Sequence, residues 1–472
     1  MSRDDAIARA TTLFDGGAFL AGLREKVALR TESQVPDAGP ALRAYLADGL
    51  GPDLARLGFS SRILDNPDGR YGPFLIAERR EDAALPTVLI YGHGDTVQGY
   101  PAQWRAGLDP WRVVVEGERW YGRGTADNKG QHLVNLAALE AVAAARGGRL
   151  GFNVRLLIET GEEVGSPGLR ALCAVHRADL AADLLIASDG PRLSAERPTL
   201  FLGSRGGVTL DLVVALREGA HHSGNWGGLL RNPATILANA IACLVDGNGR
   251  LLVEGLRPPP IPDGVRAALR GISPAGGPTD PAIDPDWGEP GLSPAERVFA
   301  WNTLEVLAFL TGNPEGPLNA VPARATATLQ LRFVVGTDWE NTPGIVRAHL
   351  DRHGFPMVEV RPARGEAFRA TRLAVDDPWV GFAMDSLART TGKAPALLPN
   401  IGGSLPNDAF SDILGMPTLW VPHSYPACSQ HAPDEHLLAP VVREGLAMMA
   451  GLFWDLGETG PAIRDARRSA AA

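Results

Sequence analysis

The sequence predicts an α/β fold, with a mixed, largely parallel sheet flanked by helices and a smaller α+β domain inserted into the chain. In the first 200 residues, helical patterns alternate with short apolar runs, an order typical of a layered domain with a parallel sheet. Near Gly203 the pattern changes to strands in which apolar and polar residues alternate. We therefore expect one domain from residues 1–203 and 373–472, with residues 204–372 inserted as a second domain.

The first domain begins with two amphipathic helices, because apolar residues three or four positions apart recur in Ala18–Val27 and Gly39–Leu57. Four short apolar runs then have the length and composition of buried strands. An alanine- and leucine-rich helix is expected between the second and the third run. The strands are Phe74–Ala77, Thr87–Tyr91, Asn153–Glu159 and Asp183–Ala187, and the helix is Gln131–Ala145.

The inserted segment begins with Val208–Ala215, where apolar and polar residues alternate as in a half-buried strand. Asn232–Val245 has a helical pattern with Asn-Pro at its start. Residues 258–292 are rich in Pro, Gly and Asp, so we expect them to be irregular. Thr326–Val335 and Met357–Arg361 are further expected strands, which completes a small α+β domain.

The C-terminal segment is expected to contribute one strand and one helix to the first domain. Pro417–Val421 is an apolar run that follows Gly415, and Ala439–Leu456 has a helical pattern. The run leads into a loop that carries His431. This loop should therefore bring polar side chains back to the sheet of the first domain.

Composition and charge exclude several classes of protein. The 45 Lys and Arg residues and 54 Asp and Glu residues give a formal net charge of −9 without a basic block, which argues against nucleic-acid and membrane partners. The longest apolar runs are too short to span a membrane. The charged start of the chain lacks the apolar stretch of a secretory signal, and three scattered cysteines fit a reducing compartment. We therefore expect a cytoplasmic enzyme.

Polar residues collect directly after the expected strands. Gly92–Thr96, Glu159–Glu163 and Ser188–Gly190 each follow an apolar run, and His431 lies in the loop after the last strand. A fifth polar stretch, Tyr121–Gly130, comes directly before the alanine-rich helix. In open α/β sheets, ligands bind just outside the carboxyl ends of the strands. The sequence thus predicts a functional site at this edge of the sheet.

Each of these residues also has a purely structural explanation. Asp127 fits the N-cap of the following helix, His93 fits a buried, hydrogen-bonded histidine, and Glu162-Glu163 fits a solvated loop pair. Together they favour a pair of divalent metals, since two ions about 3.5–4 Å apart can share a carboxylate. His93 and Asp95 point to the same side of a strand, so Asp95 can support His93 as a ligand. Adjacent Glu side chains diverge, so one can bind metal while the other acts as a base.

Eight short motifs follow one another along the chain: Gly92–Val97, Gly122–Gly130, Glu162-Glu163, Ser188-Asp189, Gly203–Gly206, His222–Gly224, Gly402–Ser404 and His431–Glu435. In this order they resemble the co-catalytic zinc peptidases, which include carnosinase-type dipeptidases, glutamate carboxypeptidases, aminoacylase and succinyl-diaminopimelate desuccinylase. The resemblance extends from about Phe19 to Leu456. Aspartate at position 189 is similar to the dipeptidase and aminoacylase branches, because the carboxypeptidase-like branch has glutamate there.

The resemblance implies a zinc-peptidase catalytic domain with two divalent metal ions, zinc or alternatively manganese or cobalt. It implies that Asp127 bridges both ions and that a cis peptide bond to the following asparagine directs its carboxylate. One ion is implied to take His93 and Asp189 as well. The other is implied to take Glu163 and His431.

For catalysis, the resemblance implies that Glu162 is the general base and then the general acid, while Asp95 orients His93. It also implies that His222, in an inserted lid or dimerisation domain, polarises the scissile carbonyl in the partner subunit of a homodimer. The neighbouring His221 remains the alternative, although Ser-Gly follows His222 as it does in the family.

Four further residues are candidates for substrate binding. Arg332 resembles the family arginine that binds a substrate carboxylate, and an ordinary surface arginine on a strand is the alternative. Asn319, Gly403 and Ser404 are the other candidates. The Asn407-Asp408 pair that follows them is unfamiliar in the family and is a candidate determinant of substrate choice.

The sequence therefore predicts a metal-dependent hydrolase that cleaves an amide bond of a small carboxylate-bearing substrate, such as a dipeptide or an N-acyl amino acid. A hydroxide between the two metals would attack the carbonyl after Glu162 takes the proton of the bridging water. A non-peptide N-acyl, carbamoyl or ester substrate remains open, because the same chemistry serves it. A non-catalytic metal-binding scaffold is the alternative from another class, and the presence of Glu162 argues against it. Neither Gly-x-Ser-x-Gly nor His-Glu-x-x-His occurs, which leaves a serine hydrolase without support.

Overall fold

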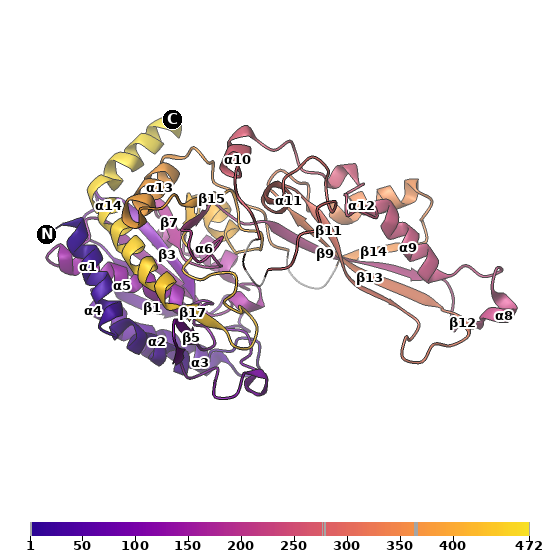
Figure 1. The fold of residues 1–472 in the computed structure, drawn as a ribbon, viewed down its shortest axis with the longest axis horizontal. Helices are drawn as coiled ribbons and strands as arrows, with labels where there is room; N and C mark the ends of the chain where they lie inside the picture. Colours follow the sequence, from indigo (N-terminus) through magenta and orange to yellow (C-terminus); the bar gives the residue numbers. More distant parts are fainter. Residues whose placement is uncertain (1, 276, 278–279, 363–366, 472) are drawn as a thin grey trace.

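The structure, a computed structural model, describes residues 2–275, 277, 280–362 and 367–471. The chain forms a larger, rounded lobe that contains both termini and a narrower lobe that projects from it (Figure 1). Residues 276, 278–279 and 363–366 of the predicted insert lie outside the described residues, as do residues 1 and 472 of the predicted catalytic domain. The division of the chain at residues 204 and 372 stays a prediction.

The larger lobe is built on an eight-stranded sheet in the order β1-β2-β6-β3-β7-β16-β8-β15. β3 pairs in parallel with β6 and β7, β7 with β16, and β8 with β15. The β1-β2, β2-β6 and β8-β16 pairs are antiparallel. The predicted mixed, largely parallel sheet is therefore confirmed. Its strands are β1 (Ser60–Leu64), β2 (Phe74–Arg79), β3 (Thr87–His93), β6 (Asn153–Glu159), β7 (Leu184–Ala187), β8 (Thr199–Phe201), β15 (Ala396–Leu398) and β16 (Thr418–Trp420).

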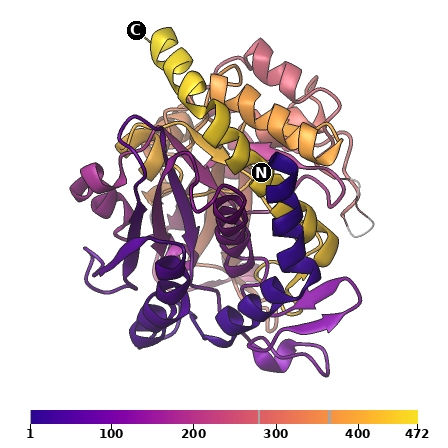
Figure 2. The ribbon, with the colours of Figure 1, turned by 90° about the vertical axis from the view of Figure 1, so that its left-hand side faces the viewer.

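Helices cover both faces of this sheet, because alternate side chains of its strands enter two separate apolar cores. Val88 and Ile90 of β3 pack in the core formed with α1, α5, α13 and α14. Leu89 and Tyr91 of the same strand pack on the opposite face with α6. Figure 2 shows the first and the last helix of the chain on the same side of the sheet. The helices are α1 (Arg3–Asp15), α2 (Ala18–Ala28), α5 (Lys129–Ala145), α6 (Leu169–Val175), α13 (Pro378–Thr391) and α14 (Ala439–Ala471).

The smaller lobe contains a four-stranded antiparallel sheet in the order β11-β13-β9-β14. Every second residue of β13 is buried, and these side chains pack against α9 and α12. The β10-β12 pair and α8 form the far end of the lobe (Figure 1). The elements are β9 (Gly206–Ala215), β10 (His221–His222), α8 (Ser223–Trp226), α9 (Pro233–Leu244), β11 (Thr303–Thr311), β12 (Ala320–Val321), β13 (Arg324–Phe333), α12 (Thr342–Arg352) and β14 (Glu359–Pro362).

Shorter elements connect these layers. A separate three-stranded sheet has the order β17-β5-β4. Its strands are β4 (Val114–Glu116), β5 (Arg119–Tyr121) and β17 (His436–Leu438). The short helices are α3 (Gly39–Ala44), α4 (Gly51–Arg56) and α7 (Arg177–Leu180), together with π-helices at Tyr45–Leu50 and Ala409–Ile413 and 3₁₀ turns at Pro101–Gln103, Glu162–Val164 and Glu254–Leu256.

Part of the segment 258–292 is helical, so the expectation that it is irregular is wrong there. α10 (Asp263–Ala268) lies within this segment, and α11 (Pro294–Phe299) follows it. Val265 and Phe299 pack in the same apolar core as Trp420 of the larger sheet. Burial against that sheet stabilises short helices that the Pro- and Gly-rich sequence does not favour on its own.

The last helix is longer than the apolar pattern predicts, because α14 continues to Ala471 instead of ending at Leu456. Among the helices of the described residues, none is both long enough and apolar enough to cross a membrane.

Candidate metal centre

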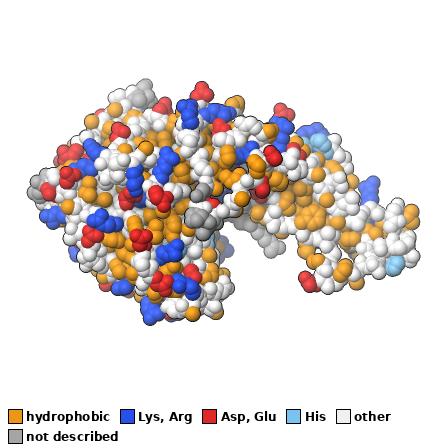
Figure 3. Space-filling model, viewed as in Figure 1, with side chains coloured by type: hydrophobic (Ala, Val, Ile, Leu, Met, Phe, Trp, Pro, Cys, Tyr) orange, Lys and Arg blue, Asp and Glu red, His pale blue; other side chains and the backbone are white. Residues whose placement is uncertain are grey.

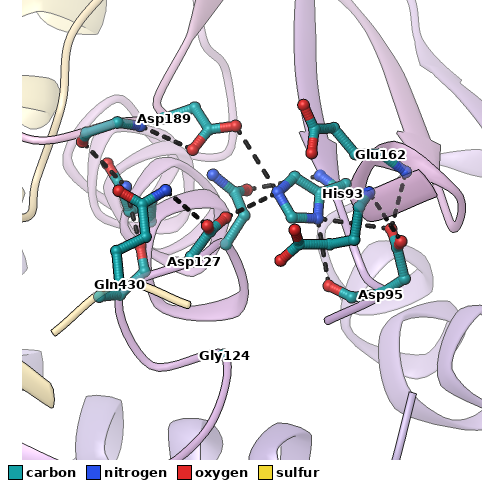
Figure 4. A network of polar contacts seen from close by, with 12 residues as sticks. His93, Asp95, Gly124, Asp127, Glu162, Asp189 and Gln430 are labelled. Carbon is teal, nitrogen blue, oxygen red and sulfur yellow. Dashed lines mark hydrogen bonds and ion pairs between the residues drawn. The ribbon is translucent and has the colours of Figure 1, made fainter. Parts of the chain in front are cut away.

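The strands β3, β6 and β7 run in parallel, so their carboxyl ends meet at one edge of the larger sheet. β3 ends at His93, and Asp189 follows the end of β7 by two residues. Glu162 begins the turn that follows β6. Figure 4 shows the side chains of His93, Asp127 and Asp189 pointing toward one another at this edge.

His93, Asp127 and Asp189 form the first group of candidate metal ligands. Nε2 of His93 lies 2.9 Å from Oδ1 of Asp127 and 3.6 Å from Oδ2 of Asp189. All three side chains are buried, and one ligand atom of each lies within 4.8 Å of the others. One imidazole nitrogen and two carboxylate oxygens at this spacing can hold a divalent ion such as Zn²⁺.

Asp127, Glu163 and His431 form the second group. Nε2 of His431 lies 2.8 Å from Oδ2 of Asp127 and 3.1 Å from Oε2 of Glu163. Their ligand atoms also lie within 4.8 Å of one another. Oδ1 of Asp127 faces the first group and Oδ2 faces the second, so its carboxylate lies between them. The structure thus brings together all five side chains that the sequence predicts as ligands.

The loop that carries Asp127 is fixed through its backbone. The peptide bond between Asp127 and the following asparagine is cis, which confirms the predicted cis bond. The buried Glu435 carboxylate accepts hydrogen bonds from three backbone N–H groups of this loop, at 2.9, 3.0 and 3.1 Å. Nη1 of the buried Arg123 donates to Glu435 at 2.7 Å. These bonds fix the direction in which the Asp127 carboxylate points.

Asp95 supports both the first group and the Glu-Glu turn. Nδ1 of His93 donates to the backbone carbonyl of Asp95 at 3.1 Å and lies 3.4 Å from Oδ1 of the same residue. The Asp95 carboxylate accepts the backbone N–H groups of Glu162 at 3.2 Å and Glu163 at 3.1 Å. A histidine that is protonated on Nδ1 keeps the lone pair on Nε2 that a metal ion needs.

Burial and mutual contact shift the pKa values of this centre in opposite directions. Burial raises the pKa of Glu163 to about 7 and that of Asp189 to about 6. For Asp127, burial is opposed by hydrogen bonds from His431 and His93, and the pKa lies below its usual range. Hydrogen bonds to Asp127 and Glu163 raise the pKa of His431 to about 11. The centre brings three carboxyl groups close together, and divalent cations can supply the positive charge that stabilises their ionised forms.

Glu162 lies beside the two groups without belonging to either. It lines a cavity of 540 Å³ together with Asp127, Asp189 and His431. Burial raises the pKa of Glu162 well above its usual range. A carboxylate with a raised pKa at the wall of a cavity is suited to take a proton from water and to release it again.

The cavity extends from the metal-binding groups to the loop that contains Gly403 and Ser404, two of the predicted substrate-binding residues. Much of the remaining wall is apolar. The apolar residues include Leu193, Phe201, Phe299, Leu398, Ile401 and Leu405.

Arg332 contacts this loop from the smaller lobe. Its Nη1 donates to Oγ of Ser404 at 2.9 Å, and its Nε donates to Oε1 of Gln330 at 2.9 Å. Burial lowers the pKa of Arg332. Arg332 is therefore a half-buried residue that contacts a loop of the cavity wall, and its role in substrate binding stays a prediction.

His222 and Asn319 lie together at the far end of the smaller lobe. The backbone N–H of Ser223 donates to the carbonyl of Asn319 at 2.8 Å. The His222 side chain is exposed, whereas the alternative His221 packs its ring against Trp226. The elements β12 and α8 at this end lie away from the larger sheet (Figure 1). The structure thus separates His222 and Asn319 from the five predicted ligands of the same chain.

Two residues that contact the Asp127 loop were not predicted from the sequence. Nε2 of Gln430 donates to Oδ2 of Asp127 at 2.5 Å (Figure 4). Glu435 holds the backbone of the loop, as described above. Gln430 is adjacent to His431 and Glu435 ends the His431–Glu435 motif, and these positions are the signals in the sequence that could have indicated them.

Comparison with known proteins shows the family to which the chain belongs. Residues 89–455 match the sequence profile of Peptidase family M20/M25/M40. The chain belongs to this family. The Beta-Ala-His dipeptidase of Homo sapiens is 31% identical to this M20 peptidase over 476 residues, which cover 93% of this chain and 90% of the relative.

Two solved structures share the fold of this M20 peptidase. The M20 family metallo-carboxypeptidase Sso-CP2 from Sulfolobus solfataricus has a TM-score of 0.76 at 25% identity and covers 93% of this chain and 99% of its own. The dipeptidase Dug1p from Saccharomyces cerevisiae has a TM-score of 0.76 at 20% identity and covers 97% of this chain and 99% of its own. The protein described here is a metallopeptidase of this family, an enzyme that hydrolyses amide bonds.

Proposed function

We propose that this M20 peptidase cleaves the amide bond of a dipeptide or an N-acyl amino acid with two metal ions that share Asp127. The observation that carries the proposal is the meeting of two ligand groups at the Asp127 carboxylate, with Glu162 on the wall of the same cavity. A non-catalytic scaffold does not require Glu162 at this place. A carbamoyl or ester substrate would use the same groups, so the experiment below includes both.

The donor atoms fit two divalent ions of intermediate softness. Two imidazoles and three carboxylates suit Zn²⁺, with Mn²⁺ and Co²⁺ as alternatives. His93 and Asp189 would hold one ion, Glu163 and His431 the other, and Asp127 both. When bound, such ions polarise a carbonyl oxygen and lower the pKa of water.

In this proposal, Glu162 moves the proton. It takes a proton from the attacking water and transfers it to the leaving nitrogen, for which a raised pKa is suited. Asp95 fixes the backbone of Glu162 and of Glu163 in one turn. One glutamate of the pair is thereby directed to a metal ion and the other to the cavity.

The walls of the cavity indicate the substrate. Ser404 is part of the wall and Arg332 donates to it, so a guanidinium lies next to the cavity and could bind the carboxylate of a small substrate. Leu398, Phe201 and Ile401 line the interior, where an apolar group is favoured over a charged one. We therefore expect dipeptides with an apolar side chain to be better substrates than dipeptides with a charged one.

The smaller lobe supports a homodimer. β11 is an edge strand of the four-stranded sheet, and four of its apolar side chains are between 43% and 64% exposed. These are Val306, Leu307, Phe309 and Leu310. An exposed apolar edge strand is a surface for a partner chain. In such a dimer, we propose that His222 stabilises the oxyanion in the partner's active site.

Two further assignments belong to the same proposal. Residues 204–372 would act as a lid and dimerisation domain on a catalytic domain formed by residues 1–203 and 373–472. The enzyme would work in the cytoplasm, and the three free cysteines are consistent with a reducing compartment.

The experiment is a substrate panel on the chelator-treated protein, reloaded with zinc, manganese or cobalt. The panel contains dipeptides with apolar and charged side chains, N-acetyl and N-carbamoyl amino acids, and an ester. We expect amino acids to be released from apolar dipeptides or their N-acetyl analogues, with Glu162→Gln as the inactive control. Turnover confined to the carbamoyl compound or the ester would contradict the proposal.

A further inference from the structure

A third group of candidate metal ligands lies in the smaller lobe. It consists of Cys243 near the C-terminal end of α9, and His349 and His353 at the C-terminal end of α12. One ligand atom of each residue lies within 4.8 Å of the others. None of the three belongs to the motifs that build the catalytic centre.

The two histidines are spaced to face one ion. They are four positions apart on α12, and their rings are stacked with centroids 4.2 Å apart and planes at 20°. Side chains four positions apart lie on the same face of a helix, and histidines at this spacing bind zinc in metalloproteases. The C-terminal end of a helix carries partial negative charge, which favours a cation at this end of α12.

His349 is already oriented by a hydrogen bond. Its side chain is buried, and Nε2 donates to the backbone carbonyl of Cys243 at 2.8 Å. In a neutral imidazole, a proton on one nitrogen leaves a lone pair on the other. Metal-binding histidines are typically held in this way, with one nitrogen bonded to a carbonyl and the other to the ion.

The other two ligands are accessible to solvent. Cys243 is a free, half-buried cysteine whose Sγ donates to the carbonyl of Ala240 at 3.0 Å. His353 is exposed, and histidine side chains reach the surface of the smaller lobe over α12 (Figure 3). The bond from His349 to the Cys243 carbonyl would by itself join α9 to α12. Cys243 also packs against the apolar core of the smaller lobe, but neither this packing nor the bond involves the imidazole of His353.

We propose that Cys243, His349 and His353 bind a zinc ion that is separate from the catalytic pair. A thiolate with two imidazoles prefers zinc to magnesium or calcium, and water would be the fourth ligand. Tetrahedral bonds of about 2.3 Å to sulfur and about 2.0–2.1 Å to nitrogen place ligand atoms about 3.3–3.7 Å apart. Rotation of the Cys243 and His353 side chains is expected to close the remaining distance. Binding releases the thiol proton and joins α9 to α12 through the ion.

Cobalt substitution tests this site independently of the catalytic centre. The catalytic ligands are nitrogen and oxygen atoms, so a near-ultraviolet sulfur-to-cobalt charge-transfer band reports only a thiolate site. We expect the chelator-treated protein to develop this band on titration with Co²⁺, with saturation at about one equivalent of thiolate-bound cobalt per chain, and to lose it on addition of zinc. Cys243→Ser should abolish the band. His353→Ala, at an exposed position, should weaken cobalt binding about 10-fold or more, since even the loss of a supporting residue costs about 10–100-fold.

Cys428→Ser is the matched control, because Cys428 is buried near the catalytic loop and should not contribute to the band. Circular dichroism and peptidase activity of Cys243→Ser establish that this variant is folded. A wild-type protein without the band would overturn the proposal. A band that persists in Cys243→Ser, or that disappears in Cys428→Ser, would also overturn it.

Discussion

Two histidines in different lobes of the molecule have contrasting surroundings. His93, at the carboxyl edge of the larger sheet, is fully buried and bonded to Asp95 and Asp127 of its own chain. His222, at the end of the smaller lobe, is exposed and bonded to the local turn at Gly224. The contacts around His93 hold its side chain in place before any metal or substrate binds. The exposed side chain of His222 is instead available to another molecule, which is why we propose that it acts in the active site of the partner subunit.

The largest effect is expected from Asp127→Ala, which removes the carboxylate between the two ligand groups. Both ions should be lost and activity should fall to background, because neither group retains its full set of ligands. Inductively coupled plasma mass spectrometry measures the metal content of the variant, and a peptidase assay on the same sample measures its activity. A fully metallated, active Asp127→Ala protein would show that Asp127 is not the shared ligand.

Glu162→Gln should separate metal binding from proton transfer. Both ions should remain bound, since Glu163 and not Glu162 belongs to a ligand group. We expect kcat to fall by about 10²–10⁴-fold, the usual contribution of a general base. The same mass spectrometry measures the metal content of this variant. An empty metal site would show that Glu162, and not Glu163, is the metal ligand.

The proposed role of His222 in the partner's active site can be tested by substitution and by mixing subunits. His222→Ala should lower kcat by about 10²–10³-fold, as the loss of one oxyanion donor does. Mixing it with Glu162→Ala under conditions that exchange subunits should restore up to about a quarter of wild-type activity, because half of the dimers are hybrids with one intact site. If exchange is demonstrated and the mixture stays inactive, His222 does not serve the partner.

The smallest effect is expected from Asp95→Asn, which keeps the shape of the side chain and removes its charge. Supporting residues of this kind contribute about 10–100-fold to metal affinity. Competition with a chromophoric chelator measures this change. If metal affinity and kcat are both unchanged in Asp95→Asn, the backbone carbonyl of Asp95 alone orients His93.

The buried strands were predictable because their apolar runs are continuous. Asn153–Glu159 was predicted with the bounds of β6. β11 was not predicted, since its exposed apolar residues lack the alternation of a half-buried strand. α1 was also missed, because only two alanines, Ala6 and Ala10, are buried on it, and packing against α14 and α5 stabilises it instead.

The grouping of the five proposed ligands was predictable because strand ends and family motifs coincide at them. The supporting contacts were not, since they join residues far apart in the sequence. Glu435 binds the backbone near residue 125, and Gln430 binds Asp127, contacts that only the folded chain brings about. The separation of His222 from its own metal centre likewise depends on the direction of the smaller lobe, which local patterns do not encode.

The most direct test of the central claim is anomalous diffraction at the zinc absorption edge from crystals of the zinc-loaded protein. The account predicts two peaks at the carboxyl edge of the larger sheet, about 3.5–4 Å apart, with one Asp127 oxygen on each. One peak lies beside His93 and Asp189, and the other beside Glu163 and His431. A single peak at this edge, or two peaks without Asp127 between them, would contradict the account.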